Sequence, residues 1–128
     1  MQKISIIYLM LFLIVQSALG QMIQLESNEA YFYIEFKSLT IEKEIRQVWV
    51  MSSYKEKNEF GDFSHRKLIQ VNCINKQYRN LQSIYYLGRN GNGKVSASSN
   101  DPKKWIFTSP NSIIDSIHNE ICSFSFKK

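Results

Sequence analysis

Few side chains in this chain of 128 residues could do chemistry at neutral pH. They are two histidines, His65 and His118, and two cysteines, Cys73 and Cys122. A small basic domain with two histidines and a lysine such as Lys67 could cleave RNA. General acid–base catalysis first requires that the groups lie within hydrogen-bond reach of one another. No spacing in the sequence brings them together, so we expect no enzyme and no catalytic residues.

Two other chemistries are disfavoured by their context. Gly88-x-x-x-x-Gly93-Lys94 matches most of a phosphate-binding loop, but Val95 replaces the Ser or Thr that holds magnesium, and a strand pattern follows instead of a helix. We predict a hairpin turn there. A metal site needs three or four convergent ligands, so we expect neither a metal nor a cofactor.

The first twenty residues have the pattern of a secretory signal. Lys3 precedes an apolar run over 4–15, and Ala18-Leu19-Gly20 supplies small residues before Gln21. The run is shorter than the roughly 20 residues that a membrane-spanning helix needs. We expect a cleaved signal over 1–20, no membrane span afterwards, and a periplasmic or secreted protein. No lipobox cysteine lies near the cleavage point, so no lipid anchor is expected.

Export changes the expected role of the cysteines. In an oxidising compartment, Cys73 and Cys122 are expected to form a disulfide. Cys73 as a nucleophile paired with His65 is the alternative, but the strand phase turns Cys73 toward the core. Closing a loop of roughly 50 residues would stabilise the fold by about 4 kcal/mol in the chain-entropy account.

Residues 21–128 are long enough for one domain. Lys3 is the only charge lost with the signal, so the net charge falls from +5 to +4. The basic residues are scattered along the chain. A nucleic-acid groove would concentrate them on one face, so nucleic acid is not an expected partner.

Hydrophobic periodicity predicts an α+β fold, with an antiparallel sheet of five or six strands and one C-terminal helix packed on one face. Residues 22–29 are expected to be an irregular lead-in. Ser109 is expected to cap the helix with Pro110 at its first position, and the tail 123–126 could form a short edge strand. The expected strands are Tyr31–Phe36, Ile45–Tyr54, His65–Cys73, Gln77–Leu87 and Lys94–Ser98, with a short apolar segment at Trp105–Phe107.

The order of several residues supports a resemblance to a known family. These residues are Trp49, Cys73, Trp105, Pro110-x-Ser112 and Cys122. Over about residues 30–122, the chain resembles the surface-adhesin protein E family of bacterial exported proteins. The resemblance implies an antiparallel sheet with a C-terminal helix, bridged cysteines, and non-enzymatic binding of host extracellular-matrix or serum proteins. The family's named adhesins are lipid-anchored, and this chain departs from them there.

A sheet face that the helix leaves uncovered is the expected partner surface. Tyr and Arg are enriched at binding hot spots, which makes Arg66, Tyr78 and Tyr86 the candidates; strand alternation puts both tyrosines on one face. Ordinary packing in the sheet is the alternative for each of them.

The other function considered is a periplasmic inhibitor or immunity-type protein that blocks an enzyme through one rigid loop, either Lys55–Gly61 or Gly88–Gly93. Self-association into a homodimer is left open.

Overall fold

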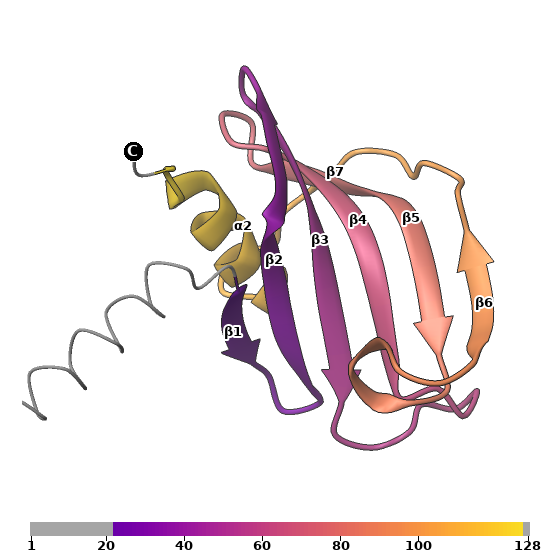
Figure 1. Ribbon diagram of the computed structural model, residues 1–128. Helices are drawn as coiled ribbons and strands as arrows, with labels where there is room; N and C mark the ends of the chain where they lie inside the picture. The colour runs from indigo at the N-terminus through magenta and orange to yellow at the C-terminus, as the bar shows by residue number, and fades with distance from the viewer. Residues whose placement is uncertain (1–21, 127–128) are drawn as a thin grey trace, which may run out of the picture.

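The computed structural model describes residues 22–126 as a single antiparallel sheet with one helix. The strands follow one another in the order β1-β2-β3-β4-β5-β6, and the short β7 also pairs with β5 (Figure 1). The predicted α+β fold class is therefore confirmed. The elements are β1 (Met22–Glu26), β2 (Ala30–Glu42), β3 (Ile45–Tyr54), β4 (Ser64–Asn72), β5 (Gln77–Tyr86), the 3-10 turn η1 (Arg89–Gly91), β6 (Val95–Ser99), β7 (Ile106–Phe107) and α2 (Ile113–Ser123).

The first strand corrects the expectation of an irregular lead-in. Met22–Glu26 pairs antiparallel with β2, so that Ile23 lies opposite Ile34 and Leu25 opposite Phe32. Ile23 and Leu25 pack against the core, while the three residues that alternate with them are exposed. The alternation covers only five residues and lies among polar residues, so the sequence pattern is too short to predict this strand.

The hairpin of β2 and β3 is longer than predicted and carries a bulge. β2 continues to Glu42, and its register with β3 shifts between Glu35 and Thr40. Within the bulge, the Ser38 hydroxyl donates to the Glu35 carbonyl (2.7 Å) and accepts from the Trp49 N–H (2.9 Å). A side chain thus replaces a lost ladder bond, as the extra residue of a bulge requires.

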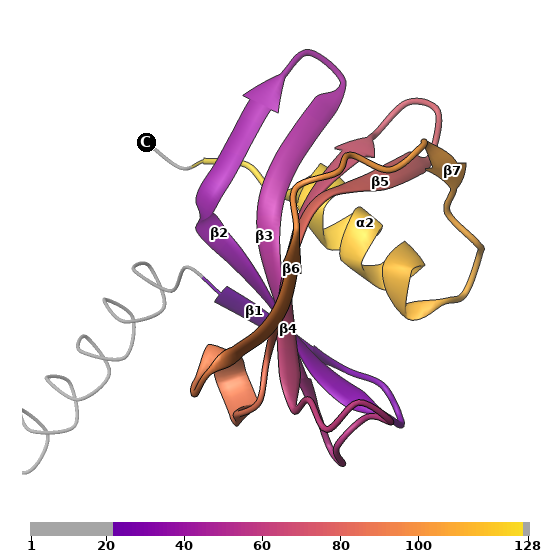
Figure 2. The ribbon, with the colours of Figure 1, turned by 90° about the vertical axis from the view of Figure 1, so that its right-hand side faces the viewer.

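The core lies between α2 and one face of the sheet (Figure 2). Ile117 and Ile121 project from the helix onto the sheet, where they join a cluster that includes Val48 and Val71. Ile121, Val48 and Val71 are fully buried. This apolar layer is the main source of stability, because burying a large apolar side chain is worth about 1.5–3 kcal/mol.

The helix begins three residues later than predicted. Ser112, not Ser109, is the N-cap, and its hydroxyl accepts from the Asp115 N–H. Asn111 has φ of 62°, so the chain is still turning there. The Ser112 hydroxyl also donates to the Ser109 carbonyl (2.6 Å). Ser109 and Pro110 therefore form the turn before the helix.

The C-terminal tail is not a strand. Phe124 follows α2, and its ring stacks on Phe36 with centroids 4.2 Å apart. Phe36 is only 2% exposed, so Phe124 closes the core at this end. Apolar packing has taken the place of the expected edge pairing.

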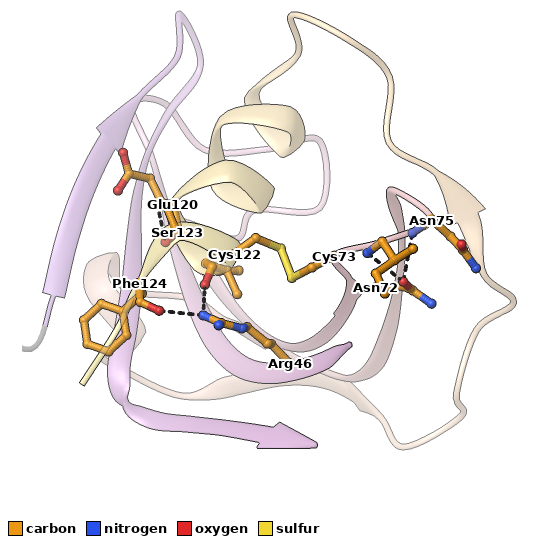
Figure 3. The surroundings of a disulfide bond; sticks show 10 residues. Arg46, Asn72, Cys73, Asn75, Glu120, Cys122, Ser123 and Phe124 are labelled. Atoms are coloured by element: carbon orange, nitrogen blue, oxygen red, sulfur yellow. Dashed lines mark hydrogen bonds between the residues drawn. A yellow bond between two sulfur atoms is a disulfide. The ribbon is translucent and has the colours of Figure 1, made fainter. Parts of the chain in front are cut away.

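The predicted disulfide is confirmed. Cys73 follows β4 directly, Cys122 lies in the last turn of α2, and their Cα atoms are 5.7 Å apart (Figure 3). The bridge spans 49 positions. It fastens the end of the helix to the turn between β4 and β5.

Arg46 holds the same end of the helix from the sheet. Its Nη1 atom donates to the carbonyls of Ile121 and Phe124, both at 2.7 Å (Figure 3). The last carbonyls of a helix lack intrahelical partners and carry partial negative charge. The half-buried Arg46 side chain satisfies two carbonyls at this end of the helix.

We expect Arg46→Met to lower the free energy of unfolding by about 2–3 kcal/mol, because two charge-assisted hydrogen bonds are lost. Urea denaturation measures this change. Arg46→Lys should recover part of the loss, because the lysine ammonium keeps the positive charge but cannot reproduce the geometry of the guanidinium hydrogen bonds. A loss below about 0.5 kcal/mol for Arg46→Met would contradict the role assigned to Arg46.

Candidate functional site

The sheet face opposite α2 is the candidate site, called the open face below. The β5–β6 connection around η1 folds over part of it (Figure 2). Register and alternation place on it half-buried side chains from four strands. They are Tyr31, Tyr33 and Glu35 of β2; Gln47, Trp49 and Met51 of β3; Arg66, Leu68 and Gln70 of β4; and Arg79, Gln82, Ile84 and Tyr86 of β5.

Arg66 lies at the centre of the open face. Its guanidinium makes a bidentate pair with Glu35, with Nε–Oε2 at 3.0 Å and Nη2–Oε1 at 2.9 Å. It also lies over the Trp49 ring, 4.6 Å from the centroid. Burial alone lowers the pKa of Arg66, but hydrogen bonds to Glu35 and Tyr86 raise it above its ordinary value. Arg66 is thus held as a charged, oriented group across strands β2, β3 and β4.

A second row of polar contacts crosses the same face toward β7. Gln70 donates from Nε2 to the Oε1 atom of Gln47 (3.0 Å), and its own Oε1 accepts from Arg79 Nε (2.8 Å). The Arg79 guanidinium lies 4.8 Å from the centroid of the Trp105 ring. The face therefore presents two arginines, each stacked on a tryptophan and oriented by a side-chain hydrogen bond.

The β5–β6 connection bounds the open face at one end. The Gly91 N–H donates to the Ser64 hydroxyl (2.9 Å), and a Cβ atom on Gly91 would lie only 2.5 Å from the Met51 side chain. Between this turn and β1 is a hollow of about 250 Å³, lined by Met22, Tyr33, Glu35, Met51 and Asn90. The segment Gly88–Gly93 is a turn that leads into β6, as predicted.

The three predicted surface residues do not share one face. Arg66 and Tyr86 lie on the open face, but Tyr78 packs against the core on the helix side. The register of β4 with β5 passes from Leu68–Gln82 to Ile69–Asn80, so Leu81 is an extra residue in β5. A one-residue bulge reverses which face the following side chains point to, which separates Tyr78 from Tyr86.

His65 lies on the helix side of β4 and is hydrogen-bonded through Nδ1 to the Tyr54 hydroxyl. Burial, with the nearby Lys67 cation, lowers the pKa of His65 to about 3. Burial, with Tyr85 and Asp62, raises the pKa of Tyr54 to about 12. At neutral pH the pair is a tyrosine hydroxyl donating to a neutral imidazole, which suits a structural hydrogen bond better than proton transfer.

His118 lies on α2 and is 1% exposed. Neither of its ring nitrogens has a hydrogen-bond partner among residues 22–126. Burial, with the Lys76 cation, lowers its pKa, although Asp115 acts in the opposite direction. His118 belongs to the helix and His65 to β4; His65 contacts Tyr54 and Tyr85, and no hydrogen bond joins the two histidines. The two histidines therefore form no shared acid–base site.

Both histidine pKa values lie below those of the unfolded chain, so acid should favour unfolding. As pH falls below about 6.5, the unfolded state binds protons that the folded state does not, which lowers stability by up to about 1.4 kcal/mol per pH unit for each histidine. Denaturation at pH 7 and pH 5 should show a loss of about 1–2 kcal/mol attributable to His65. His65→Gln should flatten this dependence; an unchanged slope would contradict the assignment.

The loop between β3 and β4 presents one exposed aromatic residue. Asn58 Oδ1 accepts from the N–H groups of Phe60 (3.0 Å) and Asp62 (2.8 Å), which fixes the loop tip. The buried Asp62 carboxylate accepts from the Ser96 hydroxyl (2.5 Å). Phe60 at the tip is 78% exposed. This is the loop that an inhibitor-type protein would use.

Comparison with known families settles the family of this chain. The family described as Surface-adhesin protein E matches residues 19–123. The chain belongs to the surface-adhesin protein E family. The match includes β1 and extends beyond the range of 30–122 on which the resemblance was recognised. No curated protein sequence matches the chain.

Solved structures of Haemophilus influenzae protein E share the fold of this family member. Its selenomethionine form has a TM-score of 0.64 at 16% identity, covering 81% of this chain and 87% of that one. Crystal form II has a TM-score of 0.62 at 17% identity, covering 72% and 80%. Protein E from non-typeable Haemophilus influenzae gives 0.58 at 18% identity, covering 81% and 76%. At these identities the likeness shows the fold alone.

Trp49 and Glu35 are parts of the open face that were not predicted as site residues. The sequence signal for Trp49 was its alternation with buried Val48 and Val50 in β3. Glu35 could be found only from the register that places β2 next to β3.

Among residues 22–126, no cluster of three or more His, Cys, Asp or Glu could hold a metal, and no helix is long and apolar enough to span a membrane.

Proposed function

We propose that this surface-adhesin E protein is a non-enzymatic binding domain that attaches to host extracellular-matrix or serum proteins through its open face. The observation that supports the proposal is the central Arg66, paired with Glu35 and stacked on Trp49. Family membership supports a surface adhesin. The choice of face and the class of partner are our own inferences.

The chemistry of the open face suits a protein partner. Tyr, Trp and Arg are enriched among the few residues that dominate binding energy at interfaces, and this face holds all three across strands β2 to β5. Arg66 and Arg79 are already fixed by stacking and hydrogen bonds. Binding would therefore cost less side-chain entropy than ordering free arginines would.

We propose that residues 1–20 direct export and are cleaved, and that the mature protein is periplasmic or secreted without a lipid anchor. These residues lie outside the described part of the chain, so the proposal rests on the sequence pattern. Mass spectrometry of the exported protein tests it. A mass that begins at Gln21 without added lipid is expected, and a lipid-modified or uncleaved protein would contradict it.

An inhibitor-type function remains the competing hypothesis, because the fixed loop with Phe60 at its tip has a suitable shape. The two functions use different parts of the molecule. An adhesin would use the open face, whereas an inhibitor would insert the loop into an active site.

The test is a binding panel with purified residues 21–128. The protein is immobilised through its C-terminus, and matrix and serum proteins are titrated alongside cell-wall enzymes and toxins of bacteria. The proposal predicts saturable binding of at least one matrix or serum protein. Binding of an enzyme alone, with loss of that enzyme's activity, would support the inhibitor hypothesis and overturn the adhesin proposal.

A further inference from the structure

One edge of the sheet exposes an apolar and basic surface that the open face does not include. It surrounds β7 and the turn after β4, and Ile74, Ile106 and Phe107 are 77%, 50% and 74% exposed. Figure 2 shows β7, and the segment leading from it to α2, on the outside of the molecule. The β7 edge patch consists of Ile74, Lys76, Lys103, Lys104, Ile106 and Phe107, all exposed.

The patch is held rigidly by backbone hydrogen bonds and strand pairing. The Lys103 N–H donates to the Asn80 carbonyl (2.8 Å), and the Thr108 N–H donates to the Lys76 carbonyl (2.9 Å). Between these bonds, Ile106 and Phe107 pair with Tyr78 and Gln77 of β5. Successive residues of a strand point to opposite faces of the sheet, so Ile106 lies on the side of Tyr78 and Phe107 on the side of Gln77. The two exposed side chains therefore flank a fixed backbone at the edge of the sheet.

The charge around these apolar residues is predominantly positive. Segments 74–79 and 101–107 contain Lys76, Arg79, Lys103 and Lys104, against Asp101 alone. One contact reduces this excess, because Asp115 lies 3.7 Å from the Lys76 ammonium. Glu42, Lys43 and Glu44 line a hollow beside Arg79 and Trp105. Lys103 and Lys104 have no ion-pair partner among residues 22–126.

We propose that the β7 edge patch binds peripherally to an anionic lipid bilayer, with Phe107, Ile106 and Ile74 entering the headgroup region and the lysines contacting lipid phosphates. Exposed apolar patches mark interaction sites in folded proteins. Apolar side chains on both sides of a sheet edge can enter a soft interface edge-on, whereas a protein partner would have to cover both sides at once. Lysines beside it are attracted to an anionic membrane surface. A soluble polyanion would use the lysines but would leave the apolar side chains exposed.

Vesicle co-sedimentation of residues 21–128 with the disulfide intact tests this proposal. Vesicles of phosphatidylcholine alone are compared with vesicles containing about one-third phosphatidylglycerol, at 50 and 300 mM salt. The anionic vesicles should bind the protein, and salt should weaken binding by shortening the Debye length from about 14 to about 6 Å. The neutral vesicles should bind at least tenfold less.

Variants separate the two parts of the patch. Each lysine near an anionic surface strengthens binding about fivefold, so K103E/K104E should weaken it at least 20-fold. Phe107→Ser combined with Ile74→Ser should weaken it at least tenfold. The matched control is Phe60→Ser, because Phe60 is 78% exposed but precedes β4, at the opposite end of that strand from Ile74 (Figure 1). This control should change binding less than twofold.

Four results would overturn the proposal. The first three are no sedimentation with either vesicle, equal binding to both vesicles, and an effect of Phe60→Ser as large as that of the Phe107→Ser/Ile74→Ser variant. Binding that K103E/K104E abolishes but Phe107→Ser/Ile74→Ser leaves unchanged would also overturn it, because a polyanion site without insertion would explain that result. None of these outcomes involves the open face, so they are independent of the proposed adhesin function.

Discussion

Replacing both Cys73 and Cys122 by serine is expected to lower the free energy of unfolding by about 4 kcal/mol. The bridge closes a loop of 49 positions, and the chain-entropy account assigns about that value to a loop of this length. A domain of this size has a total stability of only about 5–15 kcal/mol. At about 4 °C of Tm per kcal/mol, the loss corresponds to a decrease of about 15 °C.

Thermal unfolding by circular dichroism measures the effect of removing the bridge. The double serine variant is preferable to a single one, because it leaves no unpaired thiol to form intermolecular bonds. Treatment with a reductant is the matched control: it should lower the Tm of the natural protein and leave that of the variant unchanged. A decrease in Tm below about 3 °C would show that Arg46 and the apolar layer hold the helix without the bridge.

The second large effect concerns the open face. Trp49→Ala is expected to weaken binding of a matrix or serum partner at least 30-fold, since a tryptophan hot spot is worth about 2 kcal/mol or more. The substitution also removes the ring on which Arg66 is stacked. It therefore deletes the Trp49 contact and loosens the orientation of Arg66. Arg66→Lys should also weaken binding, because an ammonium cannot reproduce the bidentate pair with Glu35 or the stacking.

Phe60→Ala is the matched control for the open-face variants. It removes an exposed aromatic ring from the loop tip and leaves the open face intact. Binding by surface plasmon resonance should change less than twofold in this variant, and the Tm of each variant shows whether it remains folded. Loss of binding in Phe60→Ala with retention in Trp49→Ala would contradict the open-face proposal and favour the inhibitor hypothesis.

The sequence predicted those parts of the fold that have a strong strand pattern or a covalent constraint. β3 was predicted at its observed bounds, Ile45–Tyr54, because this run is rich in β-branched and aromatic residues, which are typical of strands. The pairing of Cys73 with Cys122 followed from the export pattern and from there being only two cysteines. Both predictions depend on local or compositional signals that tertiary packing does not alter.

The errors arose where non-local packing or one residue decides the outcome. The N-cap moved from Ser109 to Ser112 because Asn111 takes a positive φ and extends the turn. Leu81 reverses the phase of β5, so Tyr78 joined the core while Tyr86 remained on the open face. Such a bulge depends on how β4 pairs with β5, and the alternation of β5 alone contains no sign of it.

The centre of the candidate site was only partly predictable for the same reason. Arg66 was identified from its residue type and its strand phase. Its partners Glu35 and Trp49 lie 31 and 17 positions away along the chain, and only the registers of β2 with β3 and of β3 with β4 bring them together. Residue type can suggest a hot spot, whereas its orientation depends on the assembled sheet.

Hydroxyl-radical footprinting of the complex with the partner found in the binding panel tests the central claim most directly. Trp49 and Met51 are reactive side chains on the open face, and Phe60 and Phe107 report on the loop tip and the β7 edge. The account predicts that the partner protects Trp49 and Met51 from oxidation and leaves Phe60 as reactive as in the free protein. Protection of Phe60 with no change at Trp49 and Met51 would contradict the account.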